Sequence, residues 1–189
     1  MRTLATIEIR QFFNHSHEQQ ENMRISIIDN FDTKMVGHDE PEEWVDDILQ
    51  SEGIWAITVN KKFAGLFALR QLRIVSPYLQ SSTFILPEYR GKEVNTILKR
   101  AVAQAGVAIN LPLCAYIMPD NQRSIRAMKK AFPTINPELR TVPARAGLTD
   151  QRLYYDFTKI NFAVPPESGL DIYNEIHSWY ASKQLAKIL

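Results

Sequence analysis

One segment in the middle of the chain reads Phe84-Ile85-Leu86-Pro87-Glu88-Tyr89-Arg90-Gly91-Lys92-Glu93-Val94-Asn95, and it joins a strand pattern to a helix pattern. The strand pattern occupies residues 79–86, and the helix pattern, with apolar residues at steps of three and four, occupies 91–105. The first backbone N–H groups of a helix have no intrahelical partners and lie at the positive end of its dipole. A basic turn that opens into a helix is therefore a candidate anion site, the alternative being an ordinary strand-to-helix turn.

The patterns on either side of this segment alternate between strands and helices. We expect strands at residues 4–9, 54–59, 63–69, 79–86, 113–118 and 153–157, and helices at 16–31, 41–49, 91–105, 121–132 and 170–189. Consecutive strands favour antiparallel pairing, whereas the later strand–helix–strand unit favours a parallel crossover. The sequence therefore predicts an α/β fold with a mixed, mostly antiparallel central sheet, flanking helices and a C-terminal helix, and not a Rossmann domain.

Chain length limits the number of domains. The 189 residues fit one domain with an appendage. We expect a domain over residues 1–160, followed over 161–189 by a linker and an amphipathic helix. That helix either folds back onto the domain or forms a surface for a partner or a homodimer.

Composition excludes several classes of protein. The chain is 45% apolar and 23% charged, which is typical of folded proteins and excludes wholesale disorder. No apolar run is long enough to cross a bilayer, and the first residues resemble a strand more than a signal peptide. The single Cys114 excludes an internal disulfide and a cysteine-rich zinc site. We expect a cytoplasmic protein with no membrane contact and no metal site.

Charge is unevenly distributed along the chain. Residues 1–53 contain 12 acidic and 4 basic residues, whereas residues 61–159 contain 16 basic and 6 acidic ones. A basic central segment can attract nucleic acid or a phosphorylated cofactor, or it can be a solvated surface. The sequence shows no interleaved aromatic platform and no groove-reading helix, so we do not expect nucleic acid as a partner.

A second motif follows the expected strand at 113–118. It reads Pro119-x-Asn121-x-x-Ser124-Ile125-x-Ala127-Met128. Together with the order of elements and the turn at 84–95, it resembles the GNAT superfamily of acyl-CoA N-acyltransferases over roughly residues 4–158. In that family the turn carries Arg/Gln-x-x-Gly-x-Gly/Ala, and the later helix begins with Asn-x-x-Ser/Ala.

The resemblance implies an acyl-CoA-dependent N-acyltransferase, with acetyl as the expected acyl group, that transfers this group from CoA to an amine by direct attack in a ternary complex. It implies that the diphosphate of acetyl-CoA lies on the amides after Tyr89 and that pantetheine pairs with the strand at 79–86. The implied cosubstrate-binding residues are Phe84, Ile85, Leu86, Arg90, Gly91, Lys92, Glu93, Val94, Asn95, Thr96, Asn121 and Ser124. The implied acceptor is a small-molecule or peptide amine, and the acidic residues of 39–47 either attract it or form a solvated surface.

Two positions depart from the family pattern, because Glu93 and Asn95 stand where it has glycine or alanine. At ~6 Å and an effective dielectric of ~20, the Glu93 carboxylate would cost a bound diphosphate on the order of 2–3 kcal/mol. Alternatively, Glu93 points outward and complements the positive end of the helix. These departures also admit a second hypothesis: a degenerate GNAT-fold protein without catalysis that serves as an interaction or structural protein.

The proton donor of the family is also replaced. Many members carry a tyrosine seven residues after the asparagine, where this chain has Met128, whose thioether cannot donate a proton. Tyr154, Tyr155 and Tyr116 are the candidate acids, with packing in a strand as the alternative role. His38, in an expected loop, is a candidate base.

Overall fold

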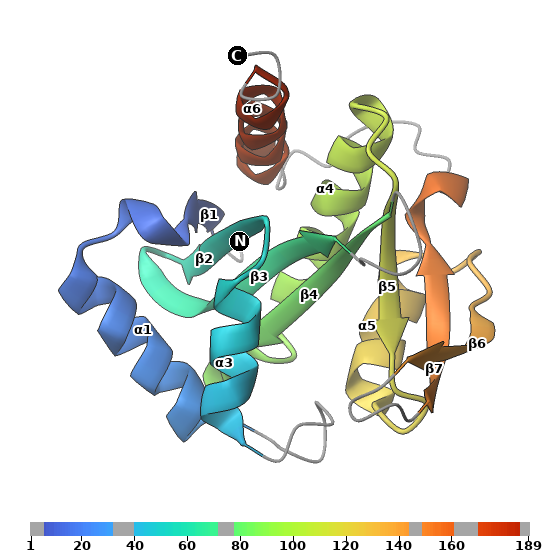
Figure 1. Ribbon diagram of the computed structural model, residues 1–189, viewed down its shortest axis with the longest axis horizontal. Helices are drawn as coiled ribbons and strands as arrows, with labels where there is room; N and C mark the ends of the chain where they lie inside the picture. The colour runs from blue at the N-terminus through green and yellow to red at the C-terminus, as the bar shows by residue number, and fades with distance from the viewer. Residues whose placement is uncertain (1–5, 32–39, 72–77, 144–148, 161–169, 186–189) are drawn as a thin grey trace, which may run out of the picture.

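The chain forms one seven-stranded sheet flanked by helices (Figure 1). The computed structural model describes residues 6–31, 40–71, 78–143, 149–160 and 170–185. The strands are β1 (Ile7–Gln11), β2 (Gly53–Val59), β3 (Lys62–Gln71), β4 (Leu79–Ile85), β5 (Leu113–Ile117), β6 (Glu138–Pro143) and β7 (Thr149–Asp156). The helices are α1 (His17–Asp29), α3 (Pro41–Leu49), α4 (Val94–Ala108), α5 (Gln122–Ala131) and α6 (Leu170–Leu185). Short 3-10 turns, η1 (Phe12–Asn14), η2 (Pro87–Tyr89) and η4 (Phe157–Lys159), complete the set.

The first four strands form an antiparallel meander in the order β1-β2-β3-β4, as the sequence predicts. The β2–β3 hairpin closes with only two residues, Asn60 and Lys61, and both have positive φ. That conformation matches the right-handed twist of the two strands, and asparagine tolerates it better than most residues. The hairpin therefore fixes the register of the sheet's centre.

The β4–α4–β5 unit makes the one parallel pairing of the sheet. The β4–β5 ladder consists of only two residue pairs, Leu79 with Leu113 and Gln80 with Cys114. Beyond Gln80 the two strands diverge, and only the end of β5 lies beside α5 (Figure 1). The sheet thus opens at its middle, next to the start of α4.

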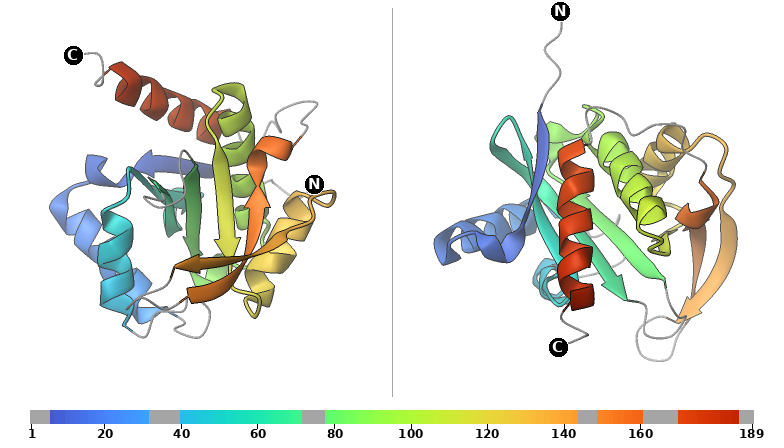
Figure 2. Two further views of the ribbon diagram at one scale, coloured as in Figure 1. Left: turned by 45° about the vertical axis from the view of Figure 1, so that its right-hand side comes forward. Right: turned by 90° about the horizontal axis from the view of Figure 1, so that it is seen from above.

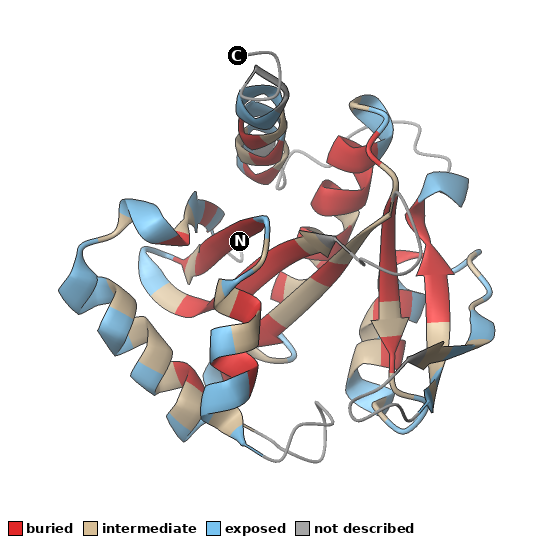
Figure 3. Cartoon of the chain, viewed as in Figure 1, coloured by how far each residue is buried: buried red, intermediate tan, exposed pale blue. Residues whose placement is uncertain are grey.

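Helices cover both faces of the sheet with apolar side chains (Figure 3). On one face, α1 and α3 bury Ile27, Trp44 and Ile48 against β2, β3 and β4. On the other face, α4 buries its Leu98 stripe together with residues of α5. Because each layer is apolar on the side that faces the sheet, the hydrophobic effect holds the layers together.

The C-terminal helix α6 packs on the same face as α4, beside β1 (Figure 2). It buries Ile172, Ile176 and Trp179 in the same core as α4, and the rings of Trp179 and Trp55 lie 5.2 Å apart. These three apolar positions of the helix are therefore covered within the chain. A domain boundary near residue 160 and a homodimer through α6 stay predictions.

The strand β6 is the element that the sequence analysis does not predict. It pairs antiparallel with β7 at the edge of the sheet, with Arg140 opposite Arg152. Its sequence, ELRTVP, has little apolar alternation, so only pairing with β7 reveals it as a strand.

Within the described ranges, no helix has the length and apolar character needed to cross a membrane.

Candidate functional site

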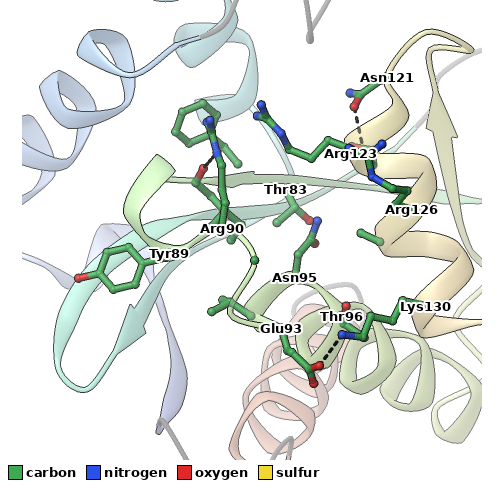
Figure 4. Close-up of a pocket in the computed structure, with 16 residues that line it drawn as sticks. Thr83, Tyr89, Arg90, Glu93, Asn95, Thr96, Asn121, Arg123, Arg126 and Lys130 are labelled. Carbon is green, nitrogen blue, oxygen red and sulfur yellow. Dashed lines mark hydrogen bonds and ion pairs between the residues drawn. The ribbon is translucent and has the colours of Figure 1, made fainter.

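A pocket of about 420 Å³ lies where β4 ends and α4 and α5 begin (Figure 4). The turn that joins β4 to α4 forms its floor, and α5 forms its opposite wall. The residues that line it are Thr83, Phe84, Ile85, Tyr89, Arg90, Gly91, Glu93, Val94, Asn95, Thr96, Asn121, Arg123, Ser124, Arg126, Ala127 and Lys130. The two motifs singled out in the sequence therefore meet in one pocket.

The N-terminus of α4 opens into this pocket without a side-chain cap. The first intrahelical hydrogen bond of α4 runs from the amide of Ile97 to the carbonyl of Glu93. Since the amides before Ile97 have no intrahelical acceptor, those of Val94, Asn95 and Thr96 are available to an anion. The pocket floor is thus a row of backbone donors at the positive end of a helix dipole.

Glu93, the residue before α4, adopts the left-handed conformation, with φ 65° and ψ −3°. A residue with a Cβ atom adopts this region at a cost in free energy, whereas glycine adopts it without that cost. This backbone conformation gives a physical reason for glycine at this position of the family pattern. The chain keeps the turn while carrying a glutamate there.

The Glu93 side chain turns towards α5 and not towards the amides of α4. Its carboxylate accepts a hydrogen bond from the ammonium group of Lys130, and the two form an ion pair across the pocket wall (Figure 4). The hydrogen bond and the charge of Lys130 hold the pKa of Glu93 below its usual value. Of the two orientations considered for Glu93, the exposed side chain agrees with the outward one, and its ion pair with Lys130 is a contact that neither alternative includes.

The end of β4 has backbone groups that no strand satisfies. The amide of Leu79 donates to the carbonyl of Pro112 on the β5 side, and backbone groups of alternate residues face the same way. Those of Thr83 and Ile85 therefore face the widening gap, beyond the last β4–β5 pair. Arg90 donates from Nε to the Ile85 carbonyl at 2.8 Å, which ties the turn to the strand end.

Asparagines occupy both sides of the pocket. Asn121 caps α5, because its Oδ1 accepts from the amide of Ser124 at 3.0 Å. Asn95 points into the pocket near Thr83, and its buried Oδ1 has no hydrogen-bond partner in the described part of the chain (Figure 4). A buried polar atom of this kind is costly unless a partner arrives, so a ligand with an N–H or O–H group would satisfy it.

Basic side chains dominate the charge of the pocket wall. Arg123, Arg126 and Lys130 lie three or four residues apart along α5, so they share one face of that helix. Arg90 adds a fourth cation from the turn, against one anion, Glu93. The pocket is therefore suited to an anionic ligand.

Ten of the twelve residues predicted to bind the cosubstrate line this pocket. The exceptions are Leu86, which is buried in the core under α1 and α3, and Lys92, whose ammonium group lies 5.4 Å from the centre of the Tyr89 ring. Sequence reasoning did not select Thr83, Tyr89 and Ala127 as site residues, and it did not separate Arg123, Arg126 and Lys130 from the other basic residues of the central segment. Their signal was the basic spacing on the expected helix at 121–132.

The two predicted catalytic tyrosines, Tyr154 and Tyr155, do not line this pocket. Tyr154 and Tyr155 are adjacent in β7 and therefore face opposite sides of the sheet. Tyr155 is buried in the core with α4, and its hydroxyl has no partner in the described part of the chain. Tyr154 packs against Tyr116 and beneath Arg140, and burial raises its pKa above the usual value. His38 lies outside the described residues, so the three roles stay predictions.

Acidic residues of α3 have structural partners. Asp46 pairs with Arg24 of α1 at 3.1 Å, and Asp47 pairs with Arg70 of β3. These two pairs favour the solvated-surface interpretation of the acidic segment for the residues involved.

Among the described residues, no group of three or more His, Cys, Asp and Glu side chains could hold a metal ion.

Comparison with known proteins identifies the family. Residues 2–131 match the family model for the acetyltransferase (GNAT) domain, which is more than half of the chain. The chain belongs to the GNAT acetyltransferase family. At family level it is an acyl-CoA N-acyltransferase. A comparison with proteins of curated function finds no match.

Solved structures share the GNAT fold at low sequence identity. Spermidine N-acetyltransferase from Vibrio cholerae, solved with CoA and spermine, has a TM-score of 0.58 and 15% identity, covering 82% of this chain and 97% of that one. An acetyltransferase from Agrobacterium tumefaciens has a TM-score of 0.59 and 15% identity, covering 82% and 92%. A GNAT-family acetyltransferase from Bacillus anthracis has a TM-score of 0.57 and 15% identity, covering 82% and 95%.

The residues of the pocket fit the cosubstrate of the GNAT family. The uncapped amides of α4 and the surrounding cations suit a diphosphate, and the open edge of β4 suits an extended chain with amide groups. The unpartnered Oδ1 of Asn95 also suits a ligand with amide N–H groups. Two side chains oppose this fit, because Glu93 and Asn95 stand where the family has small residues. The ion pair with Lys130 neutralises the charge of Glu93.

Proposed function

We propose that this chain is an acyl-CoA-dependent N-acyltransferase that moves an acyl group, most simply acetyl, to an amine by direct attack in a ternary complex. The observation that carries the proposal is the uncapped start of α4, which opens into a basic pocket beside the free edge of β4. Two motifs 30 residues or so apart in sequence supply the two walls of that pocket. This combination is suited to the phosphate and amide groups of one elongated ligand.

In the proposed complex, the chain holds the diphosphate on the amides of Val94, Asn95 and Thr96. The pantetheine arm extends along the backbone groups that face the gap between β4 and β5, which are the carbonyl of Ser81 and the amide and carbonyl of Thr83. Binding there would fix the thioester next to the gap, so that an amine meets it without the entropy cost of a bimolecular encounter. A backbone N–H of β4 would then stabilise the developing negative charge on the thioester oxygen.

Proton transfer is the part of the proposal that depends on unassigned side chains. The amine must be neutral when it attacks, and the departing thiolate gains a proton. Tyr154 remains a candidate donor, although burial raises its pKa and so makes its phenol a weaker acid. Tyr155 and His38 remain the other candidates, and water can carry the proton where no side chain reaches the site.

The acceptor in the proposal is a small-molecule or peptide amine. The Vibrio cholerae structure contains spermine beside CoA, so a polyamine is a reasonable first compound to assay. The pairing of Asp46 and Asp47 with arginines leaves the acidic face of α3 less negative than its sequence indicates. We therefore propose testing neutral and anionic amines, such as amino acids and dipeptides, alongside the polyamine.

The test is release of free thiol from acetyl-CoA in the presence of each amine, followed with a thiol reagent. The proposal predicts saturable release with at least one amine, and mass spectrometry of the product should show the added acetyl group. The same assay with Asn121→Ala should show a raised KM for acetyl-CoA, because α5 loses its cap beside the pocket.

The second candidate function is a GNAT-fold protein without catalysis that serves as an interaction or structural protein. The side chains of Glu93 and Asn95 in the pocket and the methionine at position 128 favour it. Calorimetric titration separates the two candidates. A dissociation constant for acetyl-CoA tighter than ~100 µM, about −5.5 kcal/mol, supports the enzyme, whereas no binding at millimolar concentration supports the second candidate.

A further inference from the structure

The Glu93–Lys130 ion pair bridges the two walls of the pocket. Glu93 precedes the first turn of α4, and Lys130 lies in the last turn of α5. Both residues line the pocket, and their side chains are 56% and 58% exposed, so the pair lies at its mouth and not in the core. An exposed pair of this kind contributes little to fold stability, and therefore either partner can be changed without unfolding the chain.

The position of the pair gives it an effect on anion binding. Glu93 directly precedes the uncapped amides of Val94, Asn95 and Thr96, and its carboxylate, turned towards Lys130, lies at the mouth of the same pocket. A negative charge at this point opposes any second anion that binds those amides. Lys130 neutralises the carboxylate, but while it does so its own charge is less available to the pocket.

Lys130 also continues the basic face of α5. It lies four residues after Arg126 and seven after Arg123, and all three line the pocket. Lys129, its neighbour, does not line the pocket although it is exposed and carries the same charge. The two lysines therefore carry the same charge and differ in their position relative to the pocket.

We propose that Lys130 is a phosphate ligand of this pocket and that Glu93, by pairing with it, lowers the affinity of the pocket for the phosphates of acyl-CoA. This inference rests on the proposed function. It assigns to the site one residue that binds phosphate and one residue that lowers the affinity for phosphate. The phosphate concerned is either the diphosphate or the 3′-phosphate of CoA, because both are phosphate esters that a lysine ammonium recognises as a point charge.

The test is calorimetric titration of acetyl-CoA into the wild-type chain and the Glu93→Gln, Lys130→Met and doubly substituted variants. Glu93→Gln should bind about five- to tenfold more tightly, because Lys130 is released and the repulsive charge is gone. Lys130→Met should bind about tenfold more weakly, because a phosphate ligand is lost and Glu93 is left unpaired. The double variant should bind more weakly than Glu93→Gln and more tightly than Lys130→Met.

Two matched controls remove the same charges outside the pocket. Lys129→Met and Glu88→Gln change exposed residues that do not line it, and each should alter the affinity less than twofold. Titrations with dephospho-CoA then identify the phosphate. If Lys130→Met weakens CoA and dephospho-CoA equally, Lys130 binds the diphosphate, and if it weakens CoA alone, Lys130 binds the 3′-phosphate; both results support the proposal.

The outcomes separate this inference from the function on which it rests. A wild-type chain and a Glu93→Gln variant that both fail to bind acetyl-CoA at millimolar concentration overturn the proposed function. A wild-type chain that binds acetyl-CoA with the same affinity after Lys130→Met, or more tightly than Glu93→Gln, overturns this inference alone.

Discussion

Replacing Glu93 by glycine and by alanine measures the cost of the turn that presents the amides of α4. Glu93 has φ 65°, a conformation that costs a residue with a Cβ roughly 1–2 kcal/mol. Glycine adopts it freely but loses about 0.4–1 kcal/mol more conformational entropy on folding. Both substitutions remove the carboxylate and the pair with Lys130 equally. Glu93→Gly should therefore be more stable than Glu93→Ala by about 1 kcal/mol.

The assay is thermal unfolding of the ligand-free variants at one protein concentration. For a chain of this size, a difference of about 1 kcal/mol corresponds to roughly 2–4 °C in Tm. The control pair is Ile25→Gly and Ile25→Ala, at an exposed position inside α1. There the order should reverse, with the alanine variant more stable by about 1 kcal/mol, because glycine is a poor helix former.

The reasoning is refuted if alanine at position 93 equals or exceeds glycine in Tm while the Ile25 pair behaves as expected. In that case the turn before α4 would not be left-handed in solution. The row of amides that it presents to the pocket would then lose its structural basis.

Three further predictions concern burial, packing and screening. Burial lowers the pKa of Lys99 to about 8. Between pH 8 and pH 10.5 the unfolded chain therefore binds more protons than the folded chain. As a result, Lys99 makes the free energy of unfolding rise with pH in this range. Denaturant titrations should show Lys99→Met more stable than wild type at pH 7 and the gap narrowing by pH 10; a gap independent of pH would contradict this. By the same method, Trp179→Ala should lower the free energy of unfolding by about 3 kcal/mol or more, since the ring is buried against Trp55. The control Ser178→Ala, at an exposed site, should change it by less than about 0.5 kcal/mol. Equal effects of the two substitutions would show that α6 packs loosely. Raising salt should weaken acetyl-CoA binding, because the pocket is cationic, and less so in Arg126→Gln; affinity independent of salt would contradict the charge argument.

Elements with strong local patterns could be predicted from the sequence. The β2–β3 hairpin, α4 and α5 form where apolar periodicity and turn residues place them, within a few residues. Asn121 and Ser124 were predicted as cosubstrate-binding residues, whereas the cap that they form at the start of α5 was not predicted. The meeting of the two motifs in one pocket followed from the family resemblance and not from spacing alone.

Features that depend on tertiary contacts could not be predicted. The strand β6 carries no apolar alternation and forms only because β7 offers it a partner. The pairing of Glu93 with Lys130 joins residues 37 positions apart, and only the packing of α4 against α5 reveals it. The end of the β4–β5 ladder after Gln80 is likewise set by the position of the strands, since the sequence shows each strand but not where they separate.

A crystal structure of the chain with acetyl-CoA tests the central claim most directly. The account predicts that the phosphates lie within hydrogen-bond distance of the amides of Val94, Asn95 and Thr96, and that the pantetheine chain pairs with the edge of β4 beyond Gln80. Cosubstrate bound elsewhere on the chain, or a pocket that stays closed by the side chain of Glu93 or Asn95 at saturating concentration, would contradict it.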